Sequence, residues 1–306
     1  MAADNQRFIL SPAVRAAKAD GRPLVALEST IVTHGMPYPE NLATALSVEA
    51  AVRESGAEPA TIAVIDGILR VGLSEAELSG LAQASGVMKL SRADLAYAVA
   101  LERTGSTTVA ATMIAAAAAG ISVFATGGIG GVHRGGEASL DVSADLEELA
   151  RTRVIVVSAG AKAILDIGRT LEYLETKGVP VVGYRSDELP AFWSRESGHP
   201  APLRLDGAAE IAAFQKARDE LSIGGGMLIA NPIDASHAIG RDIIEGWISL
   251  ALADAAAGGV SGKAVTPFLL SRIVELSGGR SLAANIALIR SNARLAGEIA
   301  VALAGA

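Results

Sequence analysis

The chain has 306 residues, of which half are hydrophobic and 19% are charged, so it can bury a sizeable core and is not disordered by composition. Its net charge of −7, with no tract rich in lysine or arginine, argues against a nucleic-acid polymer as a partner. It has no cysteine, which excludes disulfides, zinc–thiolate sites, iron–sulfur clusters and thiol catalysis.

Nothing in the sequence predicts a targeting or membrane segment. The opening residues, MAADNQRF, are polar and lack the apolar region of a signal peptide. The most apolar stretch, 109–121, is too short for a bilayer, which needs about 20 residues. We therefore expect a cytoplasmic protein that does not bind a membrane.

Predicted helices and strands alternate along the first half of the chain. Hydrophobic periodicity and capping residues predict helices over 9–20, 40–55, 74–85, 92–103 and 107–119, and strands over 23–29, 87–90 and 121–126. Two β-rich runs within 61–73 flank Asp66-Gly67, a pair that is typical of a hairpin turn.

The same alternation continues in the second half. Strands are expected over 153–158, 179–184 and 224–232, and helices over 161–177, 207–221, 236–256 and 265–304, with Ser143 as the N-cap of a further helix. This order predicts an α/β fold: a mostly parallel central sheet with helices on both faces and a small antiparallel hairpin. No linker or change of composition divides the chain, so we expect a single domain over 1–306.

Polar residues at the ends of apolar strands are the first candidates for a site, because ligands of open α/β sheets bind outside the carboxyl ends of strands. These residues are Glu28, Lys89, Thr126 with the glycine-rich loop after it, Lys162 and Asn231. Glu28, in VALEST, could be a general acid or base tuned by burial, or could form a structural ion pair or cap. Lys89, in GVMKLS, could bind a phosphate or simply reach solvent from an edge strand.

Lys162 follows VIVVSAGA, an apolar strand and a run of small residues. Apolar surroundings favour the neutral amine of a lysine, which can attack a carbonyl and form a Schiff base. The alternative is a lysine in the first turn of a helix that points to water, and the helix dipole disfavours a cation there.

The loop 127–136, GGIGGVHRGG, could bring backbone N–H groups close to an anion, although it matches neither a P-loop nor a dinucleotide fingerprint. His133 and Arg134 within it favour a polar ligand; the alternative is a surface loop. Asp141 and Asp145 bracket the start of a helix. They could bind a hard cation such as Mg²⁺ or Mn²⁺, or could stabilise the helix dipole, which the spacing alone favours.

The other histidines carry little signal. His34, His199 and His237 show no metal-ligand spacing, and we interpret each as structural or exposed to solvent. The sequence has no G-x-S-x-G element and no recognisable Ser-His-Asp arrangement.

Seven segments in order resemble the pseudouridine-5′-phosphate glycosidases, a family also known as pseudouridylate synthases or indigoidine-synthase-A-like proteins. The segments are LESTIVTHGMPYPEN (27–41), GSTTVAATM (105–113), FATGGIGGVHRG (124–135), DVSADLEEL (141–149), SAGAKAILDIGRTLEYLETKGVPVVGYRSDELPAFW (158–193), LIANPI (228–233) and TPFLLSRIVELSGGRSLAANIALIRSNA (266–293). They extend over nearly the whole chain, and their order makes the resemblance specific.

The resemblance implies an enzyme that reversibly cleaves the C–C glycosidic bond of pseudouridine 5′-phosphate to uracil and ribose 5-phosphate. It implies a divalent cation, usually Mn²⁺, and a homotrimer with an α/β/α fold. By resemblance, Glu28 is the proton donor and Lys162 the nucleophile that holds C1 of a ring-opened ribose as an imine.

The resemblance also assigns binding residues. The predicted substrate contacts are Lys89, the backbone around Val109, the segment Ser143-Ala144-Asp145, and His133 and Asn285. Asp141 is the predicted metal ligand. Ser158 stands where the family often has cysteine, and no proposed role depends on it.

Two other functions remain open at this point. One is a Schiff-base lyase or aldolase that acts on another sugar phosphate, which would share the lysine and the glycine-rich loop. The other is a metabolite-binding protein without catalytic activity, in which the lysine would be dispensable.

Overall fold

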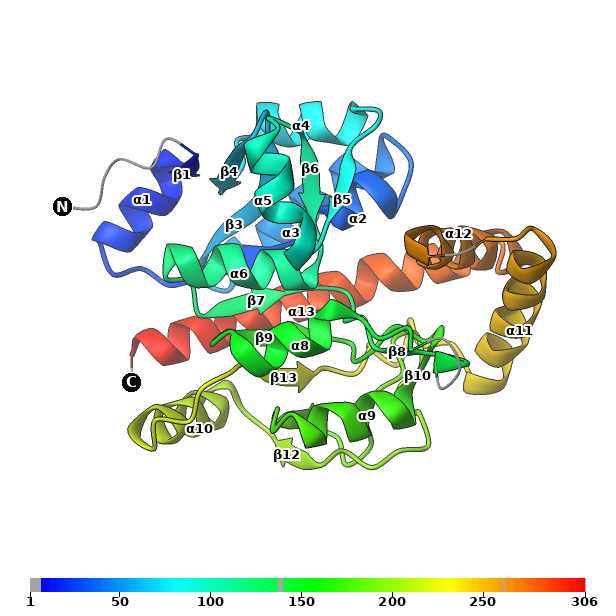
Figure 1. The fold of residues 1–306 in the computed structure, drawn as a ribbon. Helices are drawn as coiled ribbons and strands as arrows, with labels where there is room; N and C mark the ends of the chain where they lie inside the picture. Colours follow the sequence, from blue (N-terminus) through cyan, green and yellow to red (C-terminus); the bar gives the residue numbers. More distant parts are fainter. Residues whose placement is uncertain (1–6, 137–139, 261, 306) are drawn as a thin grey trace.

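The computed structural model describes residues 7–136, 140–260 and 262–305. In this part of the chain, eleven strands form a central sheet and two more form a small separate sheet (Figure 1). The strands of the central sheet are β1 Phe8–Leu10, β2 Leu24–Leu27, β3 Glu58–Ile65, β4 Ile68–Val71, β5 Met88–Leu90, β6 Gly105–Thr107, β7 Val123–Ala125, β9 Ile155–Ser158, β11 Val181–Tyr184, β12 Leu203–Leu205 and β13 Met227–Ala230. The small sheet pairs β8 Val132–His133 with β10 Leu165–Asp166.

Helices surround the central sheet. They are α1 Pro12–Ala19, α2 Thr30–His34, α3 Glu40–Glu54, α4 Glu75–Gln83, α5 Arg92–Ala100, α6 Val109–Ala119, α8 Ala144–Arg151, α9 Ile167–Thr176, α10 Ala208–Glu220, α11 Arg241–Ala257, α12 Val265–Leu276 and α13 Arg280–Ala304, with a 3₁₀ turn at Gly262–Ala264. None of the helices in the described segments has the length and apolar character that crossing a bilayer requires.

The central sheet is mixed but mostly parallel. Its main path runs β1-β4-β3-β2-β7-β9-β13-β11-β12, while β6 pairs with both β3 and β5. Among the described strands of this sheet, only the pairings of β3 with β4 and with β6 are antiparallel. The predicted α/β fold with a small antiparallel portion is therefore confirmed.

Helices cover both faces of the sheet, as predicted. The long helix α13 packs on β2, β7 and β9 and also contacts α3 and α10, whereas α6 contacts β2 and β7 and packs against α8 (Figure 1). The strands between these layers are apolar: Phe124 and Val156 are fully buried. Strands buried on both faces are typical of a parallel sheet, and this explains the continuous apolar runs in the sequence.

Turn chemistry places two of the predicted features. Asp66 and Gly67 have φ angles of 48° and 73°, the positive pair that a two-residue type I′ hairpin needs, and they join β3 to β4 as expected. Helix α4 begins with a reciprocal capping box between Ser74 and Glu77, which fixes the start predicted at Ser74.

One predicted helix is wrong in extent, and several short elements were not foreseen. The helix expected over 161–177 begins only at Ile167. Helices fill most of 236–256 and 265–304, as predicted, and the second of these ranges holds two helices separated at 277–279. Strands β1, β6 and β12, with three residues each, and the five-residue helix α2 were not predicted. Elements this short have no detectable periodicity, and sheet pairing rather than local preference defines such strands.

Gly105 lies between the helices predicted over 92–103 and 107–119, and we expected it to separate them. It instead lies in β6, where an added Cβ would approach the Leu90 side chain to 2.5 Å. The glycine therefore serves close packing in the tertiary structure, which the sequence pattern does not reveal.

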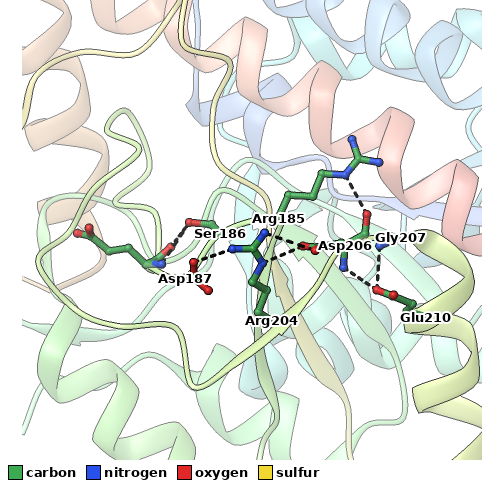
Figure 2. Close-up of polar contacts among 8 residues, drawn as sticks. Arg185, Ser186, Asp187, Arg204, Asp206, Gly207 and Glu210 are labelled. Atoms are coloured by element: carbon green, nitrogen blue, oxygen red, sulfur yellow. Dashed lines mark hydrogen bonds and ion pairs between the residues drawn. The ribbon is translucent and has the colours of Figure 1, made fainter.

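A polar network holds the outermost strand of the sheet, β12. Arg204 pairs with Asp187 and with Asp206, Arg185 donates to the Asp206 carbonyl, and Glu210 accepts the N–H groups of Asp206 and Gly207 (Figure 2). These groups are exposed, so each pair contributes little to stability. Their effect is to fasten the edge strand to the start of α10.

A buried asparagine fastens α13 to the centre of the sheet. Asn292 is fully buried, and its Nδ2 donates to the carbonyl of Thr126 (2.8 Å), at the end of β7. Its Oδ1 accepts from Asn231 (3.0 Å), which follows β13. Because Asn292 is fully buried, loss of its side chain would leave the Thr126 carbonyl and the Asn231 amide without these hydrogen-bond partners.

We predict that Asn292→Ala lowers the free energy of unfolding by about 2–3 kcal/mol, because it leaves buried hydrogen-bonding groups without partners. Arg290→Ala, on the same helix but exposed, is the matched control and should leave stability nearly unchanged. Urea unfolding of both variants measures the difference. Equal midpoints for the two variants would show that this anchor is unimportant.

Candidate active site

Three neighbouring parallel strands end at the candidate site. Strands β2, β7 and β9 are adjacent in the sheet and are followed by Glu28, Thr126 and the segment leading to Lys162. The carboxyl ends of parallel strands meet at one edge of a sheet, so these polar residues gather there. A buried hydroxyl network holds the turn after β2: the Ser29 hydroxyl donates to the Ile62 carbonyl (2.6 Å) and accepts from the N–H of Thr107 (2.9 Å).

Glu28 lies in a setting that favours its protonated form. Protein surrounds its carboxyl group, and burial raises its pKa from the ordinary value, while nearby Lys162, a hydrogen bond donated by Thr126, and Lys89 oppose that rise. The net direction is upward because desolvation of a carboxylate outweighs these contributions. Thr126 is itself fully buried, so it fixes the orientation of the carboxyl group. Such a carboxyl group can act as a proton donor.

Lys162 is not in a helix, which corrects the prediction of a helix over 161–177. Ala161 forms a parallel bridge with Ile129, the Lys162 N–H donates to the Ile129 carbonyl (3.1 Å), and the Lys162 carbonyl accepts from the Leu165 N–H (3.0 Å) in a turn. Pairing between the loops after β7 and β9 therefore continues the sheet and postpones the helix to Ile167. The flanking Ala161 and Ala163 are buried, so Lys162 has apolar neighbours on both sides in the chain.

Lys89 approaches the same place from another part of the sheet. It lies in β5, opposite Ser106 of β6, and its charge acts on both Glu28 and His34. It therefore faces the site, which is evidence against the alternative of an edge-strand lysine that reaches solvent.

The glycine-rich loop is held mainly by interactions within the protein. The Asp145 carboxylate accepts the N–H of Gly130 (2.8 Å) and the N–H of Ala110 in the first turn of α6 (2.9 Å). An added Cβ on Gly130 would come within 2.2 Å of the Ser143 hydroxyl. The glycines thus allow close packing, and Asp145 stabilises helix α6 at its positive end.

Asp141 and His133 lie side by side on the wall of the site. Asp141 Oδ2 is 3.8 Å from His133 Nδ1, and the His133 N–H donates to the Asp141 carbonyl (3.0 Å). The Asp141 side chain is about half exposed. Across the ranges that the structure describes, no three His, Asp or Glu side chains gather closely enough to hold a metal by themselves.

Two adjoining cavities bring all ten predicted site residues together. A polar cavity of about 360 Å³ is lined by Glu28, Lys89, Val109, His133, Asp141, Ser143, Ala144, Asp145 and Lys162. A narrower cavity of about 80 Å³ shares Glu28, Lys89 and Lys162 with it and adds Asn285. The individual roles of these residues stay predictions, but their gathering from distant parts of the sequence is a feature of the structure.

The sequence analysis missed residues that line the narrower cavity. His34, interpreted as structural or solvent-exposed, faces it, as do Phe192 and Leu288. Phe192 has a positive φ of 60°, rare for an aromatic residue, and its ring occupies the space beside Gly128. No local signal reveals these residues. Apolar side chains such as Phe192 and Leu288 look like core residues in the sequence, and a single histidine such as His34 forms no recognisable motif.

Comparison with known proteins gives a consistent result. The sequence profile of the family described as "Indigoidine synthase A like protein" matches residues 13–302. The chain is 62% identical over 296 residues to a protein of Methylobacterium nodulans named pseudouridine-5′-phosphate glycosidase, covering 97% of this chain and 88% of that one. It is 65% identical to pseudouridine-5′-phosphate glycosidase 1 of Rhizobium johnstonii, covering 96% and 92%.

Two solved structures share the fold. The prealnumycin C-glycosynthase AlnA, in complex with ribulose 5-phosphate, has a TM-score of 0.91 and 42% sequence identity over 98% of both chains. An indigoidine synthase A-like protein of Thermotoga maritima has a TM-score of 0.87 and 35% identity over 97% of this chain and 96% of that one. The extent of these matches shows that the chain belongs to the indigoidine synthase A-like protein family.

Proposed function

We propose that this protein is a pseudouridine-5′-phosphate glycosidase, which reversibly cleaves the C–C glycosidic bond of pseudouridine 5′-phosphate to uracil and ribose 5-phosphate. The observation that carries the proposal is the position of Glu28 and Lys162 where the polar and the narrow cavity adjoin. A nucleotide with its base in one cavity and its sugar phosphate in the other has its glycosidic bond at this junction. The names of the close relatives support the same activity.

The two cavities differ in chemistry as base and sugar phosphate do. Ile31, Met36, Phe192, Leu270 and Leu288 line the narrow cavity, which suits a flat base. The larger cavity is polar and includes Lys89, Ser143 and Val109, the first residue of α6. The Ala110 N–H in the first turn of α6 already bonds to the Asp145 carboxylate. The Lys89 ammonium and the Ser143 hydroxyl are therefore the groups of this cavity that suit a phosphate.

A carbon-linked base explains the need for both an amine and an acid. Direct departure of uracil as a carbanion lacks a good leaving group. The Lys162 amine attacks C1 of the ribose, forming a C–N bond and releasing the ring oxygen as a hydroxyl. Glu28 then protonates the uracil carbon as the C–C bond breaks, and the lysine nitrogen forms a C=N bond to C1. Water hydrolyses this imine, which releases ribose 5-phosphate and restores the amine.

The side chain of Asp141 suits a divalent cation, which we propose to be Mn²⁺. One half-exposed carboxylate on the cavity wall fits a hard cation that keeps several waters and shares oxygens of the substrate. Such an ion would neutralise negative charge on the substrate's oxygens. Asp141 would hold it, and His133 would orient Asp141.

We also propose that the protein forms a homotrimer and is located in the cytoplasm. The resemblance to the family is the basis of the homotrimer, and the cytoplasm is the location expected in the sequence analysis. Exposed Ile243 and Leu250, on one side of α11, offer an apolar contact for another copy of the chain.

We predict that borohydride, added to enzyme and substrate, leaves a ribose-phosphate adduct on Lys162, and that Lys162→Ala lowers turnover by about a thousandfold or more, because the amine forms the covalent intermediate. Mass spectrometry of peptides locates the adduct. Synthesis of a C-glycoside from uracil and ribose 5-phosphate tests the function itself. An adduct on Lys89, or none in an active sample, would count against Lys162 as the nucleophile. Turnover of another sugar phosphate without C-glycoside synthesis would favour a lyase or aldolase, and binding without turnover would indicate a metabolite-binding protein.

The raised pKa of Glu28 predicts that activity persists to higher pH than an ordinary carboxylic acid would allow and then falls as the acid loses its proton. Thr126→Val removes a hydrogen bond that lowers this pKa, so the falling limb should move to higher pH. Thr112→Val, which changes another fully buried threonine, is the control and should not move the limb. If the falling limb of the pH profile stays in place in Thr126→Val, this limb does not report the ionisation of Glu28.

The same shift predicts the pH dependence of stability. The folded-state pKa of Glu28 is raised. The stability that this group contributes is therefore fully present at pH below its unfolded-state pKa and is lost as the pH rises through its folded-state pKa. Glu28→Gln should therefore flatten the stability profile above the ordinary carboxyl range. Thermal unfolding across pH measures it, and an unchanged profile would contradict the shift.

We predict that a chelator abolishes turnover and that Mn²⁺ restores it. Asp141→Asn should raise the Mn²⁺ concentration needed for half-maximal activity by roughly tenfold or more, because ligand loss weakens a site that has few protein ligands. Asp254→Asn, an exposed aspartate on α11, is the matched control. Full activity of wild-type protein in the chelator would show that no metal is needed.

A further inference from the structure

The narrow cavity contains one histidine that the mechanism above does not use. His34 is the last residue of α2, is partly buried, and lines the cavity together with Lys89 and Asn285. Most of the other walls are apolar, so these side chains decide which hydrogen bonds a flat ligand can make there.

A chain of hydrogen bonds fixes the tautomer of His34. Its Nδ1 is 2.6 Å from the Thr33 hydroxyl, which donates to the Ser106 hydroxyl (2.7 Å), which in turn donates to the Met88 carbonyl (3.4 Å). With the Thr33 proton donated to Ser106, the short contact to Thr33 favours a proton on His34 Nδ1; the Ser106 hydroxyl also lies 3.4 Å from Nδ1. A neutral imidazole has one N–H, so its Nε2 is an acceptor.

The surroundings keep the imidazole neutral. Burial, and then the charge of Lys89, lower the pKa of His34 from its ordinary value. The Nδ1 edge faces fully buried Ser106, which leaves the edge with Nε2 for the cavity. The cavity therefore offers a lone pair at this point.

Asn285 supplies the complementary group. Its Oδ1 accepts a hydrogen bond from the indole N–H of Trp193 (2.6 Å), which can only donate. The amide orientation is thereby set, and the NH₂ group remains as a donor. This acceptor and this donor, in a cavity that also has polar groups such as Lys89, Thr30 and Thr266 on its walls, match the N–H and C=O groups of a uracil edge.

We infer that His34 determines specificity for the base by accepting a hydrogen bond at Nε2 from a ring N–H of uracil, an inference that rests on the proposed function. Asn285 donates to a uracil carbonyl in the same cavity. A base that turns a ring lone pair toward His34 leaves two acceptors facing each other without water, and so is rejected.

The test is steady-state kinetics of C-glycoside synthesis with Mn²⁺, varying uracil and ribose 5-phosphate separately. His34→Phe keeps a ring but removes the acceptor, and should raise KM for uracil roughly tenfold while KM for ribose 5-phosphate changes less than about twofold. His34→Gln, which restores an acceptor, should recover part of the affinity. Thr33→Val, which removes the partner of Nδ1, should raise the same KM by less. His237→Phe, at an exposed histidine outside both cavities, is the matched control.

Methylated bases give a second readout. Wild-type enzyme should discriminate against 1-methyluracil or 3-methyluracil relative to uracil, and His34→Phe should lose most of that discrimination. Equal rises in both KM values, a fall in kcat alone, or unchanged discrimination would overturn the role of His34. Wild-type enzyme that makes no C-glycoside would instead overturn the proposed function. Thermal unfolding verifies that each variant is folded. If His34→Phe does not fold, the test uses Thr33→Val and His34→Gln.

Discussion

The parallel pairing of β2 with β7, and of β7 with β9, is the constraint on which the candidate site depends. Strand β2 (Leu24–Leu27) lies far from β7 (Val123–Ala125) and β9 (Ile155–Ser158) in the sequence, yet the carboxyl ends of all three strands share one edge of the sheet. Pairing continues past the ends of β7 and β9, where Ala161 bridges Ile129. That extension holds the Lys162 N–H on the Ile129 carbonyl, and Lys162 lines the same cavity as Glu28.

Buried polar side chains then fix the loops that the strands leave. Asp145 links the glycine-rich loop to the first turn of α6, and Asn292 links the end of β7 to α13. Each of these groups would be costly to bury without its partners, so each defines one arrangement of the surrounding backbone. The cavity walls are therefore positioned before a ligand binds, which reduces the ordering that binding requires.

Charge is divided among the residues at the junction of the cavities. Glu28 has a raised pKa, because burial outweighs the lysines nearby, whereas His34 has a lowered one, for burial and Lys89 both disfavour its cation. These pKa shifts favour the protonated acid and the neutral imidazole in one small volume. A protonated acid and a neutral acceptor are the states that donation to a base carbon and recognition of a base N–H require.

The sequence by itself determined the α/β class, the Asp66-Gly67 hairpin and the candidate residues Glu28, Lys89 and Lys162, because turn chemistry and polar strand ends are local signals. The resemblance added the roles of Asp141 as a metal ligand and of Ser143 as a substrate contact, and it added Asn285, which no pattern distinguishes. The tertiary structure alone decided the late start of α9, the packing role of Gly105, the use of Asp145 as a link between loop and helix, and the presence of His34 in the cavity. These features arise from contacts between segments far apart in the chain, and a local pattern carries no information about its distant partner.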